Sequence, residues 1–264
     1  MKNFIYVIVR LILQTVGQLS TGIRMSYTYG FTSGKMLEYV YKNKPSGVTK
    51  FGVILDKLYL SHPGWQSVRE RMFNLVGTLS DTVKVLEKEC TNITDIAGGT
   101  GLYFFKVVQK VGKNKVKVVV RDIEEKWVKE GNKKARNLGL KGVIKFKKGD
   151  AFDIEDLNRD ICDSDIVVAS GFYDWFEDKK LIEKSFKLIF ECLPKGRYFI
   201  FTIQTKHFNL EFTNAMFLDF HRRKLTMTTT EHNNVLQMLK RSGFRLVDFK
   251  SDSWGYYTVY RTLK

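Results

Sequence analysis

The sequence predicts an α/β fold, with a seven-stranded, mainly parallel sheet that ends in an antiparallel strand and follows an N-terminal helical cap. From residue 92 onward, short apolar runs alternate with amphipathic helical patterns, as in successive βα units. The last two apolar runs, residues 244–249 and 256–262, have no helix between them. A hairpin at that point makes the last strand antiparallel to the rest of the sheet.

The expected strands share a short apolar core, and they cover residues 93–97, 116–120, 143–146, 166–169, 198–203, 244–249 and 256–262. The expected helices have apolar residues at helical spacing, and they cover residues 102–111, 125–138, 178–192, about 210–224, and 231–242. Pro194 and Gly196 end the third of these helices, and Gly243 ends the last. We therefore expect residues 91–264 to form one domain.

Residues 1–90 read as helices, with a break at 44–47 and a helix start at Pro63. We expect them to form the cap. The first helix carries an apolar run, residues 4–13, that is too short and too interrupted to span a bilayer, and no cleavage site follows it. Two alternatives remain, a helix within residues 1–24 lying on a membrane surface or a helix packed on its own domain.

The chain is strongly basic, with 44 Lys and Arg against 28 Asp and Glu and a net charge of +16. The excess is spread along the chain without one dense block, and no known nucleic-acid module accompanies it, so nucleic acid is not the favoured partner. Biased genome composition is an alternative source of the Lys content. Cys90, Cys162 and Cys192 form neither a disulfide framework nor a metal pattern, so we expect a cytoplasmic protein without a metal site, one that could also lie on the inner membrane surface.

A glycine-rich loop, Asp95-Ile-Ala-Gly-Gly-Thr-Gly101, lies between the first expected strand and the next helix. Backbone amides and the helix dipole at such a turn can receive a polar ligand. About 20 residues further on, the second strand ends at Asp122, which is placed to accept hydrogen bonds from two ribose hydroxyls. This pattern fits either a nicotinamide dinucleotide or S-adenosylmethionine.

Three features favour S-adenosylmethionine over a dinucleotide. Phe104 occupies the position of the third small residue in the dinucleotide fingerprint. Asp95 suits a cationic amino-acid cofactor and would be unfavourable beside a pyrophosphate. The terminal hairpin also belongs with proteins that bind S-adenosylmethionine.

At these residues the chain resembles the class I methyltransferases, which have a Rossmann-like sheet. Asp95, Gly99 and Gly101 match their first motif, whereas Ala97 replaces its first glycine and Gly98 is additional. The resemblance implies that Asp95 and the loop hold the methionine end, and Asp122 the ribose. It further implies that Asp150–Phe152 flank the adenine and that Ser170–Phe172 lie beneath the reactive methyl. The implied cofactor-binding residues are Asp95, Ala97, Gly98, Gly99, Thr100, Gly101, Asp122, Ile123, Asp150, Ala151, Phe152, Ser170, Gly171 and Phe172.

A closer resemblance is to a family of bacterial proteins classed as methyltransferases, some of which are fused to an α/β-hydrolase domain. It covers nearly the whole chain. The residues that carry it are Asn43–Gly47, His62–Trp65 with Arg69 and Arg71, Asp95–Gly101, Gly171–Phe176, Gln204 with His207, and Trp254-Gly255. The resemblance implies the chemistry and leaves the methyl acceptor open.

His207, after the fifth strand, and Tyr173 are the expected catalytic side chains, with a loop histidine and a packing aromatic as the alternatives. The only prolines are Pro45, Pro63 and Pro194, so the Asn/Asp-Pro-Pro-aromatic tetrad of many base N-methyltransferases is absent, as is the Pro-Cys pair of cytosine C5 methylation. We expect methyl transfer to a small molecule or lipid-like acceptor, with a protein acceptor as the alternative. The alternative function is a catalytically silent, membrane-associated cofactor-binding module.

Overall fold

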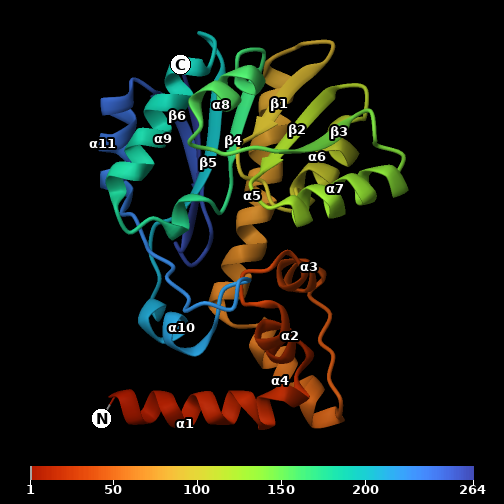
Figure 1. Ribbon diagram of the computed structural model, residues 1–264, viewed down its shortest axis with the longest axis vertical. Helices are drawn as coiled ribbons and strands as arrows, with labels where there is room; N and C mark the ends of the chain where they lie inside the picture. Colours follow the sequence, from red (N-terminus) through yellow and green to blue (C-terminus); the bar gives the residue numbers. More distant parts are fainter. Residues whose placement is uncertain (1) are drawn as a thin grey trace. The chain divides into compact units, whose positions relative to one another are not determined.

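The computed structural model describes residues 2–264 and divides the chain into two compact units (Figure 1). The first unit contains the residues up to Glu70 together with His207–Thr228, and the second contains Arg71–Lys206 and Thr229–Lys264. This division differs from the expected one at residue 90. The boundary falls inside a helix, at Glu70, and the first unit includes a segment that follows the fifth strand.

The second unit contains a seven-stranded sheet in the order β3-β2-β1-β4-β5-β7-β6, which confirms the predicted fold class. The strands are β1 (Thr91–Asp95), β2 (Val116–Asp122), β3 (Ile144–Lys148), β4 (Ile166–Ala169), β5 (Tyr198–Gln204), β6 (Arg245–Ser251) and β7 (Tyr257–Leu263). The first five strands pair in parallel, and β7 runs antiparallel to β5 from Tyr198↔Leu263 to Gln204↔Tyr257. The carboxyl ends of β1 to β4 therefore meet at one edge of the sheet.

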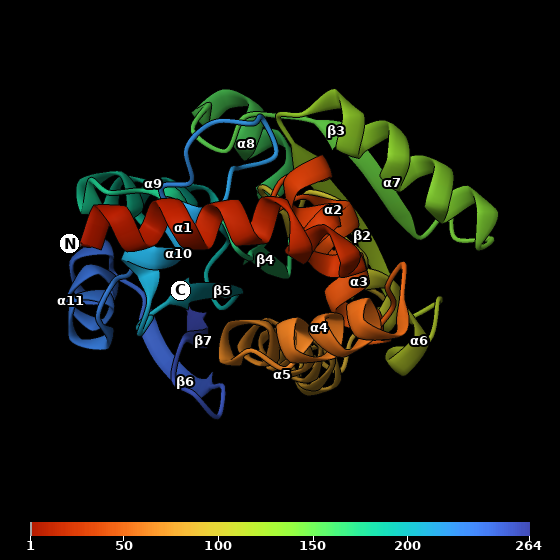
Figure 2. The same ribbon diagram turned by 90° about the horizontal axis from the view of Figure 1, so that it is seen from below.

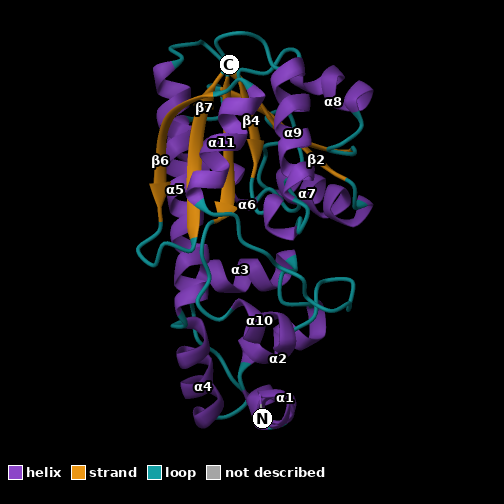
Figure 3. Cartoon of the chain, turned by 90° about the vertical axis from the view of Figure 1, so that its left-hand side faces the viewer, coloured by secondary structure: helices purple, strands orange, loops and turns teal. Residues whose placement is uncertain are grey.

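Helices cover both faces of this sheet (Figure 3). The helices on one face are α8 (Ile154–Ile161), α9 (Lys179–Cys192) and α11 (His232–Ser242), and those on the other are the second-unit part of α5 (Pro63–Val85), α6 (Leu102–Val111) and α7 (Glu125–Asn137). Asp153 and Asp178 start α8 and α9 by accepting hydrogen bonds from backbone N–H groups of their first turns. Burial on both faces explains why β4 and β5 read as nearly continuous apolar runs.

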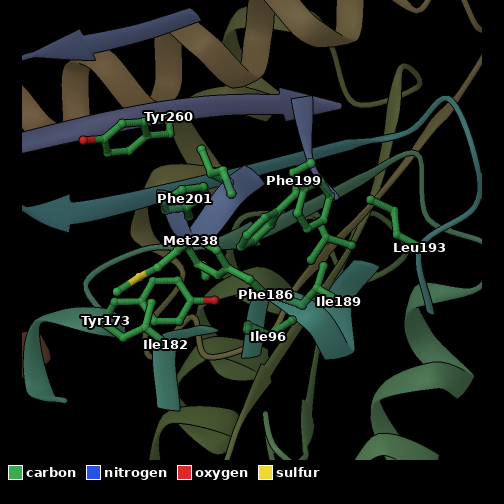
Figure 4. Close-up of a cluster of buried hydrophobic side chains, with 14 of the residues drawn as sticks. Ile96, Tyr173, Ile182, Phe186, Ile189, Leu193, Phe199, Phe201, Met238 and Tyr260 are labelled. Atoms are coloured by element: carbon green, nitrogen blue, oxygen red, sulfur yellow. The ribbon is translucent and has the colours of Figure 1, made fainter. Parts of the chain in front are cut away.

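An aromatic core fills the space between the sheet and α9 (Figure 4). Phe199 and Phe201 of β5 have ring centroids 4.8 Å apart, and Phe186 of α9 lies 4.7 Å from Phe201. All three rings are fully buried. This core holds β4 and β5 firmly below the loops that follow them.

The first unit is helical, with α1 (Lys2–Gln14), η1 (Val16–Leu19), α2 (Thr21–Tyr29), α3 (Gly34–Lys42), α4 (Lys50–Leu60), the start of α5, and α10 (Leu210–Met216). Asp56 of α4 is completely buried within this unit. Its carboxylate accepts hydrogen bonds from the Ser20 hydroxyl (2.6 Å), the Gly22 N–H (2.6 Å), the Ser46 N–H (2.9 Å) and the Tyr39 hydroxyl. One buried acid thus connects four segments.

Two expected elements need correction, and one helix was missed. The strand expected at 93–97 covers Thr91–Asp95, because Thr91 is buried and the chain turns after Asp95. The helix expected at about 210–224 ends at Met216, and residues beyond it form an irregular segment with one bridge, Leu218↔Lys224. Helix α8 was not expected from the sequence. Among residues 2–264, no helix is long and apolar enough to cross a membrane.

Candidate functional site

The loop between β1 and α6 is a tight turn built from glycines. The Gly98 N–H donates to the Arg121 carbonyl (2.9 Å) and the Gly101 N–H donates to the Gly98 carbonyl (2.8 Å). Gly99 and Gly101 have φ angles of +55° and +56°, a region that side chains disfavour. A Cβ at Gly101 would also lie 2.9 Å from the Phe146 ring. Residues 97–100 remain partly exposed, so a ligand can reach the turn.

Asp95, the last residue of β1, places a fully buried carboxyl under this turn. It accepts hydrogen bonds from the Ala97 N–H (3.2 Å) and the Tyr103 hydroxyl. Burial nevertheless raises the pKa of Asp95 to about 7, and the charge of Asp122 adds to the rise. A Cβ at Gly98 would lie 2.8 Å from the Asp95 Cγ, so a glycine is needed there too.

Asp122, the last residue of β2, joins the second loop to the first. One carboxylate oxygen accepts a hydrogen bond from the Gly99 N–H and the other from the Glu124 N–H, both at 2.8 Å. Burial raises the pKa of Asp122 above its usual value. The neighbouring Ile123 is well exposed. The structure therefore brings two of the predicted acids and the glycine turn into one cluster.

The loop after β3 is fixed by a buried arginine that the sequence reasoning did not identify. Arg121 has no exposed surface, donates to the Asp150 carbonyl (3.1 Å), and forms ion pairs with Asp156 and with Asp160 (3.0 Å). The Asp150 carboxylate accepts from the Phe152 N–H (2.8 Å). The available signal in the sequence was a charged residue near the end of an apolar strand. Such a residue, when buried, requires oppositely charged or hydrogen-bonding partners.

Aromatic contacts join the third and fourth loops. Phe152 and Phe172, both half-buried, have ring centroids 5.8 Å apart, whereas Ala151 is buried beneath the loop. Phe152 was predicted beside the adenine and Phe172 near the methyl, and the structure places the two in contact. The fourth loop turns at Gly171 (φ +69°), whose N–H donates to the Thr202 hydroxyl (2.9 Å), while Ser170 lies at the same hydroxyl (3.4 Å).

The motif residues Arg71 and Gly171–Phe176 come together in the second unit. The Arg71 guanidinium lies 3.5 Å from the Asp174 carboxylate and 4.5 Å from the centroid of the Tyr257 ring. Asp174 also accepts a hydrogen bond from the Gln204 N–H (2.8 Å). Arg71 and Asp174 are buried, and burial raises the pKa of Asp174 although Arg71 opposes the rise. This pair ties α5 to the loop after β4 and to the end of β5.

Tyr173 corrects one expectation. Its side chain has no exposed surface, lies within the aromatic core, and shares a hydrogen bond with the Ser185 hydroxyl (2.9 Å) (Figure 4). Burial raises the pKa of Tyr173 further above its normal value. A phenol in this position packs the core, so the packing alternative replaces the catalytic one.

His207 belongs to the first unit, whereas the loops described above belong to the second. Burial, with a smaller contribution from His62, lowers the pKa of His207 to about 4. Its Nδ1 accepts a hydrogen bond from the Asn209 N–H (3.2 Å). The imidazole is therefore neutral near pH 7 and chemically able to accept a proton.

The strand order, the glycine turn after β1 and the acid at the end of β2 define the fold of the class I methyltransferases. The chain belongs to the family described as "Putative methyltransferase", whose model matches residues 1–263. S-adenosylmethionine is the cofactor of this class of enzymes.

One curated relative is the uncharacterized protein YnbC of Escherichia coli (strain K12), which is 28% identical over 258 residues. The match covers 96% of this chain and 44% of YnbC, so the chain spans less than half of that relative.

Two solved structures have a similar fold. One is a possible exported protein from Bordetella parapertussis, with a TM-score of 0.71, 14% identity, and coverage of 88% of this chain and 79% of that one. The other is magnesium protoporphyrin IX methyltransferase (ChlM) from Synechocystis PCC 6803 with bound SAH, with a TM-score of 0.60, 13% identity, and coverage of 89% and 97%.

The buried pair of Arg71 and Asp174 gives a stability prediction. We expect Arg71→Met to lower the free energy of unfolding by about 3 kcal/mol, because it leaves the Asp174 carboxyl buried without its cation. The double variant Arg71→Met/Asp174→Asn should lose less than the sum of the two single variants. Denaturant unfolding of all four proteins measures this coupling, and strictly additive losses would contradict it.

Proposed function

We propose that this chain is an S-adenosylmethionine-dependent methyltransferase whose cofactor lies at the carboxyl edge of β1 to β4. The observation that supports this most strongly is the joint placement of Asp95 and Asp122 around the Gly98–Gly101 turn. Two carboxyls whose pKa values are raised by burial favour a cationic ligand over a pyrophosphate. At Gly99, where the turn is partly exposed, the missing side chain leaves room for that ligand.

The predicted binding residues divide by loop. In the proposal, Asp95, Ala97 and the Gly98–Gly101 backbone hold the methionine end, and Asp122 with Ile123 holds the ribose. Asp150, Ala151 and Phe152 flank the adenine, and Ser170–Phe172 lie beneath the methyl. The joining hydrogen bonds of Asp122 and Arg121 support this arrangement, because they fix neighbouring loops before any ligand arrives.

The cofactor, when bound, supplies an activated methyl group for in-line transfer. The chain itself must align the acceptor with that methyl and exclude water, and positioning of this kind lowers a barrier by up to roughly 7–11 kcal/mol. A base is required only where the acceptor keeps its proton at neutral pH. His207 remains the candidate base, since a pKa of about 4 keeps its imidazole neutral, at the expense of basicity.

The proposed acceptor is a small molecule or a lipid-like compound. The relative from Synechocystis is named for magnesium protoporphyrin IX, and another structural neighbour was solved with apigenin, so this fold accommodates small organic acceptors.

The proposed location is the cytoplasm, in line with three free cysteines, with peripheral contact of residues 1–24 at the inner membrane surface. A silent cofactor-binding module at a membrane is the second candidate, favoured by the exposed apolar side chains of α1.

Asp95 should make cofactor binding depend on pH. Because the pKa of Asp95 is about 7, its carboxyl is mostly protonated at about pH 6, and binding a cation there must release the proton. We expect release of nearly one proton per site at about pH 6, and tighter binding as the pH rises toward 7.5. Calorimetry in buffers of different ionisation enthalpy measures the release, which should be absent in Asp95→Asn. Equal release by wild type and variant would contradict the role of Asp95.

Asp122 tests the identity of the cofactor. We expect Asp122→Ala to weaken binding of S-adenosylmethionine and S-adenosylhomocysteine roughly 10- to 100-fold, because a charged acceptor of hydrogen bonds is lost. Asp163→Ala, which removes an exposed carboxyl of the same unit, is the matched control. Calorimetry with both ligands and NAD decides, after a thermal melt has shown that the variant is folded. Binding of NAD alone would overturn the proposal.

Activity and acceptor can be tested together with a labelled methyl group. We expect label to pass from S-adenosylmethionine into a component of a lipid or metabolite extract, with Asp122→Ala as the negative control. Separation of organic and aqueous phases then assigns the acceptor to lipids or to soluble metabolites. Binding of the cofactor without any transfer would support the silent module instead.

A further inference from the structure

Two helices of the first unit, α1 and α4, turn large apolar side chains to solvent. Six of them, each between 53% and 70% accessible, are Phe4, Val7 and Leu11 of α1 with Phe51, Ile54 and Leu58 of α4. Figures 1 and 3 draw α1 and the start of α4 at the same end of this unit, and Figure 2 shows both helices from that end. We call these six side chains the apolar surface.

The other faces of both helices are already used for packing. In α1, Tyr6 meets Phe212 edge to face at 5.7 Å, and Arg10 donates a hydrogen bond to the Ala215 carbonyl. In α4, Asp56 and Leu60 are buried in the unit. The apolar surface is thus the outer side of docked helices, and the described part of the chain leaves it exposed.

The exposed charges on α1 and on residues 44–60 are all positive. Within α1 and residues 44–60, the only acidic residue is Asp56, which is buried and accepts hydrogen bonds from four groups. Lys44, Lys50 and Lys57 are exposed beside the apolar residues of α4, and Arg10 is exposed on α1. A surface that combines apolar side chains with unopposed cations is complementary to anionic lipid headgroups above an acyl layer.

The same charges disfavour a second copy of this chain as the occupant. A twofold contact through this surface would bring the lysines of one copy against those of the other. Neither helix can span a bilayer, because α1 has 13 residues and α4 has 11. Both are long enough to lie in the interface.

We infer that α1 and α4 together form a docking surface for an anionic phospholipid bilayer, with the apolar surface in the interfacial layer and the lysines at the lipid phosphates. This goes beyond a contact limited to residues 1–24, because α4 supplies half of the apolar side chains and two of the four cations, Lys50 and Lys57. It stands independently of methyl transfer.

Vesicle flotation of the full chain tests the surface. The vesicles contain phosphatidylcholine alone or mixed with phosphatidylglycerol. We expect binding to the mixed vesicles, weakened by added salt, and at least about tenfold weaker binding to phosphatidylcholine alone. Equal binding to both vesicle types, or none to the mixed ones, would overturn the inference.

Two double variants locate the contact, Val7→Glu/Leu11→Glu on α1 and Phe51→Glu/Leu58→Glu on α4. Each should weaken binding to the mixed vesicles at least about tenfold, since it places two negative charges at an anionic surface. The matched control is Phe73→Glu on the second-unit part of α5, where the phenylalanine is 79% exposed. It should bind like the wild type.

Loss confined to the α1 variant would overturn the role of α4. If light scattering shows a dimer that the α4 variant dissolves while no vesicles are bound, the occupant is a second copy and the inference fails. Calorimetry with S-adenosylmethionine on the same variants separates this result from the proposed function, because the substituted residues lie outside the cofactor loops. Unchanged cofactor affinity also shows that the variants are folded.

Discussion

The candidate site depends on two carboxyl groups that the sheet forces close together. Because β1 and β2 are parallel neighbours, Asp95 and Asp122 end at the same edge, where burial raises the pKa of both carboxyls and the charge of Asp122 adds to the rise for Asp95. Backbone N–H groups of the glycine turn offset part of the cost of ionising these carboxyls, which is why the turn and the acids form one unit. A bound cation would lower the rest of that cost, which is the physical basis of the proposed cofactor site.

Most of the second unit could be predicted from the sequence, since β4, β5 and the final hairpin are apolar runs bounded by clear breaks. The order of the loops followed from parallel pairing, and with it the clustering of Asp95, the glycine turn and Asp122. The direction of a side chain could not be predicted in the same way. Tyr173 follows a candidate site loop, yet a 3-10 turn (Tyr173–Trp175) points its ring into the core, whereas Arg121 is held inside by acids of a helix that has weak apolar character.

The sequence did not predict which segments form the first unit, because this depends on contacts between residues that are far apart in the chain. The Phe31 N–H donates to the Leu218 carbonyl (2.9 Å), and the Phe31 ring stacks on Phe217 at 4.5 Å. A Cβ at Gly30 would lie 2.6 Å from the Asp219 carbonyl carbon, so the segments around these two residues lie in direct contact. No local pattern in residues 1–90 predicts contact with the segment that begins at His207.

This construction has a consequence for folding during synthesis. Ribosomes add roughly 5–20 residues per second, so on the order of ten seconds passes between completion of the first segment and the arrival of His207–Thr228. For that time the aromatic side chains that later meet Phe217, among them Phe31 and Tyr59, have only part of their final surroundings. The segment made first therefore reaches its native packing only after β5 has left the ribosome, and a nascent chain halted earlier presents an aromatic surface for chaperones to bind.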